Sequence, residues 1–161
     1  MQAKEAFAAL GAAEKIAAAL YKWITGNRGT KRTLVMELQE NIELIRLYVE
    51  SDSDPKKLIP KIHEAVFRKA LADGFNFNSL QRSAIATRST QDLPQLRKYH
   101  GWETQRVFEN VYQKVATLKH AVTITDSKKP VLIGVRLNNV FMLMVMLATH
   151  IGGKNDQQHK T

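Results

Sequence analysis

The stretch from residue 131 to residue 151 (VLIGVRLNNVFMLMVMLATHI) restricts the folds open to this chain more than any other stretch. From Val140 to Ala148 it is apolar on every side of a helix, and such a helix must be buried in a bundle, against a partner chain or in lipid. Arg136, Asn138 and Asn139 lie just upstream, and each of these polar groups would need a partner inside a bilayer. We therefore predict that the stretch is the central core helix of a soluble bundle, with a subunit interface as the main alternative.

Strand patterns of useful length are missing, and apolar residues recur at helical spacing in four further segments, about residues 2–25, 30–50, 55–73 and 94–123. The residues from Gly26 to Gly29 should form a turn between the first two segments. Asp54 should cap the third segment, with Pro55 at its first helical position, and Pro60 should start or kink the regular part. Gly101 should divide the fourth segment into a short lead-in and a long helix.

These patterns predict an all-α fold, a single-domain helical bundle of four to five mostly antiparallel helices with an apolar C-terminal core helix. The bundle domain should span residues 1–152, and residues 153–161 should form a disordered polar tail. Residues 75–92 are the least regular part, where a short helix would fit from Leu80 to Thr87. The stretch from Ser89 to Asp92 resembles a helix cap.

The charge of the chain is positive and unevenly distributed. The formal net charge at pH 7 is +9; residues 1–80 carry 12 basic and 10 acidic side chains, and residues 81–161 carry 12 basic and 5 acidic ones. Such an excess in one half indicates a basic face for an anionic partner, although scattered surface charge would give the same totals. The chain has no cysteine, which excludes disulfides and thiolate catalysis and favours a cytoplasmic location.

Basic and aromatic residues are interleaved between residues 81 and 114, and a second basic group surrounds the first interhelical turn. Nucleic-acid surfaces combine cations that neutralise phosphates with flat rings that stack on bases, although aromatic rings are also ordinary core residues. The residues that we predict to bind nucleic acid or another anion are Arg28, Lys31, Arg32, Arg82, Arg88, Arg97, Lys98, Trp102 and Arg106.

Several polar residues occur at apolar positions of the predicted helices, and buried polar groups need partners. We predict that they form one buried network that fixes the register of the second helix against the last one, with an ion pair between Glu37 and Arg136 at its centre. The alternative is a polar pocket lined by Met142, Met144 and Met146, whose flexible side chains also suit adaptable binding surfaces. The members of this predicted network are Glu37, Asn41, Arg136, Asn138 and Asn139.

Sequence motifs for metal, cofactor or nucleotide chemistry are missing. The five histidines have no paired helical spacing, and neither a phosphate loop nor a nucleophile elbow occurs, so we expect no metal and no cofactor. As a small basic helical bundle, the chain resembles the HEPN ribonucleases, whose signature is an arginine followed four to six residues later by histidine. The spacing from Arg97 to His100 is too short for that signature, so we do not assign the chain to this family, and the pair is retained only as a candidate to be tested for catalysis.

The combined observations predict a non-enzymatic, cytoplasmic binding protein whose basic C-terminal half contacts nucleic acid or an acidic protein partner. One alternative is an oligomeric scaffold subunit of a larger complex that packs through its apolar last helix. A peripheral membrane protein is a further alternative, and a small helical nuclease is the weakest.

Overall fold

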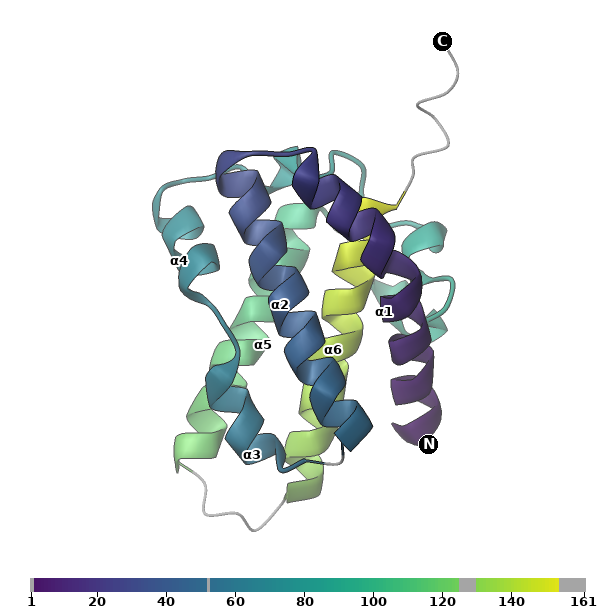
Figure 1. Cartoon of the computed structure of the whole chain (residues 1–161), viewed down its shortest axis with the longest axis vertical. Helices are drawn as coiled ribbons and strands as arrows, with labels where there is room; N and C mark the ends of the chain where they lie inside the picture. Colours follow the sequence, from purple (N-terminus) through teal and green to yellow (C-terminus); the bar gives the residue numbers. More distant parts are fainter. Residues whose placement is uncertain (1, 52, 125–129, 154–161) are drawn as a thin grey trace.

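The computed structural model describes residues 2–51, 53–124 and 130–153. Within these ranges the chain forms six α-helices, four short 3-10 helices and no strand, which confirms the expected all-α fold. In Figure 1, α1 and α6 run in one direction, and α2 and α5 run in the other. The elements are α1 Gln2–Thr25, α2 Gly29–Ser51, α3 Pro55–Leu58, η1 Ile59–Lys61, α4 Ala65–Ala72, η2 Phe77–Ser79, η3 Thr87–Thr90, η4 Pro94–Tyr99, α5 Thr104–Ile124 and α6 Pro130–Gly152.

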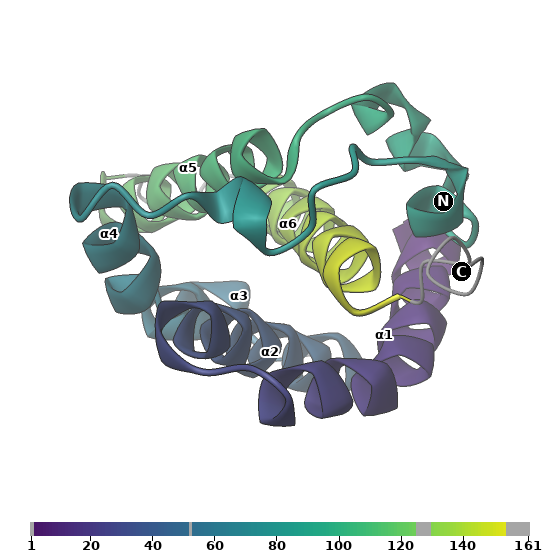
Figure 2. The ribbon, with the colours of Figure 1, turned by 90° about the horizontal axis from the view of Figure 1, so that it is seen from above.

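Helix α6 lies among the other long helices, as the view along the bundle in Figure 2 shows. It packs most extensively against α1, then against α5 and α2, and the 3-10 helix η3 covers it as well. Every residue from Val140 to Ala148 is at most 4% exposed, so the apolar C-terminal core helix is confirmed. The span Leu132–Gly152 is also long and apolar enough to cross a membrane, but that test uses length and composition only, and a buried core helix passes it equally.

The contact between α1 and α6 depends on small side chains. Ala9, Ala12 and Ala13 are buried on α1. At the end of α6, a Cβ atom added to Gly152 would lie 3.4 Å from the Leu20 side chain, which is close packing with little space to spare. Because α1, α2 and α5 together cover the apolar part of α6, a subunit interface on this helix would have to use its first turns instead.

The third predicted segment forms three pieces, α3, η1 and α4, rather than one helix. Asp54 accepts a backbone hydrogen bond at 3.0 Å and Pro55 occupies the first turn, which confirms the predicted start. Pro60 lies within η1, and the chain becomes extended at Ile62 before α4 begins at Ala65. Proline has no N–H to donate, so a helical path through this point lacks one of its bonds.

Two buried side chains of α2 satisfy the backbone groups that this break leaves free. Glu37 accepts hydrogen bonds from the backbone N–H of Val66 at 2.8 Å and of Phe67 at 3.2 Å, which are first-turn donors of α4. Asn41 accepts from the backbone N–H of His63 at 2.8 Å and donates to its carbonyl oxygen at 2.9 Å. The Glu37 carboxylate therefore does what a capping residue would do, and its charge suits the positive end of the helix.

The predicted buried network between α2 and α6 is wrong in its partners. Glu37 and Asn41 are buried, but they bind the η1–α4 segment, whereas Arg136 and Asn139 are exposed and Asn138 is only half-buried on α6. The physical reason is that the free backbone N–H groups of α4 stabilise the buried Glu37 carboxylate by hydrogen bonds. No guanidinium then has to be removed from water.

Residues 73–103 connect α4 to α5 mainly through 3-10 turns. The stretch from Leu80 to Thr87, where a short helix was an option, reaches helical conformation only at its end, in η3. Its backbone pairs with a distant segment instead: the Ile85 N–H donates to the Trp102 carbonyl at 2.9 Å, and the Gly101 N–H donates to the Ile85 carbonyl at 2.9 Å. Gly101 has a φ of 87°, which glycine adopts without strain, and it separates η4 from α5 as predicted.

The stretch from Ser89 to Asp92 does not act as the predicted cap. Ser89 and Thr90 lie inside η3, and the following helix, η4, begins at Pro94 with no side-chain cap. The Thr90 hydroxyl is instead 2.6 Å from the ring nitrogen Nε2 of His100. A hydroxyl has many partners within reach in an irregular segment, so local spacing alone does not fix its role.

A buried polar cluster holds the C-terminal end of α6. His150 is 1% exposed, and its Nε2 atom lies 3.0 Å from the Thr104 hydroxyl, which donates to the Gln81 carbonyl at 2.7 Å. The Gln81 amide in turn donates to the His150 carbonyl at 3.3 Å. Burial, and then the charge of Arg88, lower the pKa of His150 to about 4, so this ring is neutral at pH 7.

Candidate functional site

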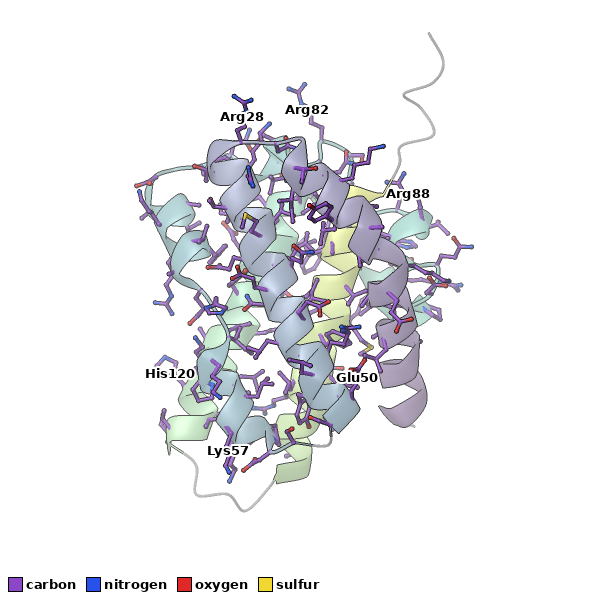
Figure 3. All side chains as sticks on the ribbon, in the orientation of Figure 1. Arg28, Glu50, Lys57, Arg82, Arg88 and His120 are labelled. Carbon is purple, nitrogen blue, oxygen red and sulfur yellow. The ribbon has the colours of Figure 1, made fainter. Side chains whose placement is uncertain are left out.

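The basic residues predicted to bind an anion do not all occupy one surface. Arg28 and Arg82 project from the same end of the bundle, as Figure 3 shows. Lys31 and Arg32 follow in the first turns of α2, while Arg97 and Lys98 belong to η4. The predicted set is therefore divided between the end of the bundle and the connecting segment.

The end of the bundle is a weak candidate for a binding site. A hollow of about 310 Å³ beside Arg82 is lined by amides and a serine but also by Glu103, so its charge is mixed. Arg88 is half-buried and lies against the last turn of α6, where its guanidinium carbon would be 3.4 Å from a Cβ atom added to Gly153. Arg88 is thus engaged in the fold, and its charge compensates the negative end of α6.

The aromatic residues of the basic region are mostly packed. Tyr99 and Tyr112 are buried, and Tyr99 contacts Trp102 edge-on with 4.8 Å between ring centroids. The Arg106 guanidinium lies 3.7 Å from the centroid of the Trp102 ring. Arg106 therefore covers one face of the half-buried Trp102, a cation–π contact that uses a face a nucleobase would need.

The residues named as a catalytic test pair do not form a site with each other. Arg97 and His100 are both exposed, and the His100 ring is bound to Thr90. Among the described residues there is also no group of three or more histidine and acidic side chains that could hold a metal ion.

A groove between α5 and α6 has the properties expected of a binding site. It encloses about 400 Å³, within the size range of small-ligand pockets. Its rim is polar on both helices, and its floor includes Leu118 and Val140. The residues that line this α5–α6 groove are Asn110, Gln113, Lys114, Thr117, Leu118, Arg136, Asn139 and Val140.

A second hollow of about 230 Å³ continues the groove toward η4. The two share Lys114 and Asn139, so they form one path along the surface. Lys98 lies at the far end of this path, and Arg136 lies at the other. The residues that line this η4 hollow are Gln95, Leu96, Lys98, Tyr99, Lys114, Asn139, Met142 and Leu143.

The charge along the groove and the hollow is of one sign. None of the described residues that line them carries a carboxylate. Lys98, Lys114 and Arg136 form no ion pair with any carboxylate in the part of the chain that the structure describes. Unpaired cations facing a concave surface raise the local concentration of anions.

Asn110 contributes an incomplete hydrogen-bonding group to the groove. Its Oδ1 atom is buried and has no partner among the described residues. Buried polar atoms are usually satisfied, and rotation of the amide brings either its oxygen or its NH₂ group toward the groove. A bound molecule with both donors and acceptors would complete this group.

Most of the groove was not identified from the sequence. Lys98 was a predicted anion-binding residue, but Lys114 was not in the predicted set, and Arg136 and Asn139 were assigned to a buried network. A usable signal was present on α5, where Asn110, Gln113, Lys114 and Thr117 follow helical spacing and form a polar stripe. Pairing that stripe with the exposed residues of α6 requires the tertiary structure.

Comparison with protein-family models, with curated proteins and with solved structures gives no match for this chain.

Proposed function

We propose that this protein is a binding protein that holds nucleic acid in the α5–α6 groove and the adjoining η4 hollow. The observation that carries the proposal is a concave surface with three cations, several amides and no carboxylate among its described lining residues. Lysine and arginine neutralise phosphates, and amide side chains pair with the donors and acceptors of base edges. Under this proposal, the anionic partner of the basic C-terminal half binds in the groove and the hollow.

An acidic protein is the other partner that such charge could attract. Its carboxylates would bind Lys114 and Arg136, but they are acceptors only, so other groups of the partner would have to donate to the amide oxygens of Asn110 and Asn139. Nucleobases present donors and acceptors together, so they match the amides as well as the cations. Nucleic acid is therefore the better match.

The test is the affinity of the full chain for a fluorescent oligonucleotide over a range of salt concentrations. Three phosphate contacts give a logarithmic salt slope of about −2, which weakens binding about 20-fold between 50 and 200 mM salt. The variant Lys114→Gln/Arg136→Gln should lose most of the affinity and reduce the slope by about 1.4.

The matched control is Arg28→Gln/Arg32→Gln, which removes the same net charge at the end of the bundle. It should bind almost as the wild type does. If this control loses the binding and the groove variant keeps it, or if no nucleic acid binds at low salt, the proposal is wrong. Capture of polyglutamate with equal affinity would instead favour an acidic protein partner.

A further inference from the structure

We infer that the groove binds a single strand and contacts its unpaired bases, rather than binding duplex. This inference rests on the proposed function and specifies its ligand. The groove is concave, and it lies between two packed helices. Sequence in a duplex is read by a convex element, such as a protruding helix, that enters the major groove. A flexible single strand can instead settle into a concave surface.

The three cations mark the path that the strand would follow. Lys98 and Lys114 line the η4 hollow, and Lys114 and Arg136 line the α5–α6 groove. Their order along the surface is therefore Lys98, Lys114 and Arg136, with the lysine of α5 between the other two. The phosphates of a strand that follows this path would meet these cations, as in a positively charged channel that tracks a backbone.

The amides line the same two hollows as the cations. Asn110 and Gln113 are on the α5 wall, and Asn139 of α6 belongs to both hollows. Asparagine and glutamine offer a donor and an acceptor in one plane, which matches the edge of an unpaired base. The Asn110 Oδ1 atom is buried and has no partner among the described residues, so a base edge would satisfy this amide after its rotation toward the groove.

The apolar residues of the two hollows close the floor beneath the amides. Leu118 and Val140 form part of the α5–α6 groove, and Met142 and Leu143 form part of the η4 hollow; all four are between 1% and 4% exposed. The Met142 sulfur also accepts a hydrogen bond from the Gln95 amide at 3.0 Å. Base contact in this site therefore depends on the amide side chains and not on stacking.

The test compares a set of 12-nucleotide homopolymers with a duplex of the same length at equal salt. A surface that acts through charge alone would favour the duplex, because its charge density is higher. We expect the opposite, with the preferred single strand bound about tenfold more tightly than the duplex and about tenfold more tightly than the least preferred homopolymer.

The variant Asn139→Ala separates base contact from charge. It should reduce the spread of affinities among the homopolymers to about twofold. The salt slope should stay at the wild-type value, because the phosphate contacts remain. Gln39→Ala, an amide on α2 that lines neither hollow, is the matched control and should keep the spread. Thermal unfolding of each variant confirms that it is folded.

The outcomes distinguish the two proposals. Equal or tighter binding of duplex, or a spread unchanged by Asn139→Ala, overturns the single-strand inference while nucleic-acid binding stands. No binding of either form overturns both.

Discussion

Protonation of His150 should destabilise this fold between pH 6.5 and 4. The ring is 1% exposed, and burial and the Arg88 charge lower its pKa from 6.5 to about 4. The unfolded chain therefore takes up the proton first as the pH falls. The stabilisation is fully present above pH 6.5 and is lost progressively down to about pH 4. Converted at about 1.36 kcal/mol per pKa unit, this difference corresponds to about 3 kcal/mol of unfolding free energy.

The measurement is urea unfolding at a series of pH values from 7.5 to 4.5 for the wild type and for His150→Gln. Between pH 6.5 and 5, the unfolding free energy of the wild type should fall by about 2 kcal/mol more than that of the variant, because only the wild type carries the His150 ring. The variant starts from a lower stability, since it loses the contact with Thr104, so the slope and not the absolute value is compared.

His120→Gln serves as the control, because His120 is exposed and points away from the bundle in Figure 3. It should keep the wild-type slope, and carboxylates that titrate at low pH affect all three proteins alike. Equal slopes for the wild type and His150→Gln, or an NMR titration of the His150 ring near pH 6.5, would refute the reasoning.

Three further substitutions test the contacts that hold the α3–α4 segment, each by urea unfolding at pH 7. Glu37→Gln should cost about 2 kcal/mol, because one amide oxygen cannot replace a carboxylate that accepts from two N–H groups of α4; a cost near zero would contradict the cap. Asn41→Leu should cost about 3 kcal/mol, because the backbone N–H and carbonyl of His63 both lose their partner. Unchanged hydrogen exchange of the His63 amide would argue against these two hydrogen bonds. Lys119→Met should cost only about 1 kcal/mol, since its 2.8 Å ion pair with Glu64 is partly exposed; a loss above about 3 kcal/mol would mean that the pair is effectively buried.

The pH dependence of the ion pair between Lys119 and Glu64 follows from the pKa of Glu64. Burial raises the pKa of Glu64, but hydrogen bonds and charges from Lys119 and Arg68 outweigh it and hold the pKa below its ordinary value. The stabilisation from the pair is therefore present above the unfolded pKa and is lost as the pH falls through the folded one. The cost of Lys119→Met should accordingly shrink in acid.

Local signals predicted the helices well because their causes are local. Asp54 with Pro55 predicted the start of α3, and Gly101 predicted the division before α5. Capping and proline or glycine geometry act within a few residues, so they can be read without the fold. The irregularity of residues 75–92 was predicted correctly, but the contacts of this segment were not, because the Ile85 backbone pairs with Trp102, which is distant in sequence.

The candidate site could also be predicted only in part, because it depends on residues that are distant in sequence. The excess of positive charge in the second half is visible in the sequence, and Lys98 was identified from it. Arg136 was expected to be buried, because the sequence does not show which face of a long apolar helix its neighbours leave open. That Arg136 and Asn139 of α6 are exposed follows from the placement of the neighbouring helices.

The sequence by itself predicted an all-α bundle built around its last helix, because a segment that is apolar on all sides must be buried, and the polar residues upstream of it argue against lipid. Only the tertiary structure decided the partners of its polar residues. Glu37 caps a helix that exists because the chain breaks after Pro60, and Arg136 faces a groove that exists because α5 packs beside α6. Hydrophobic burial is non-directional and can be read from composition and spacing, whereas hydrogen bonds and ion pairs depend on which groups the fold brings within about 3 Å.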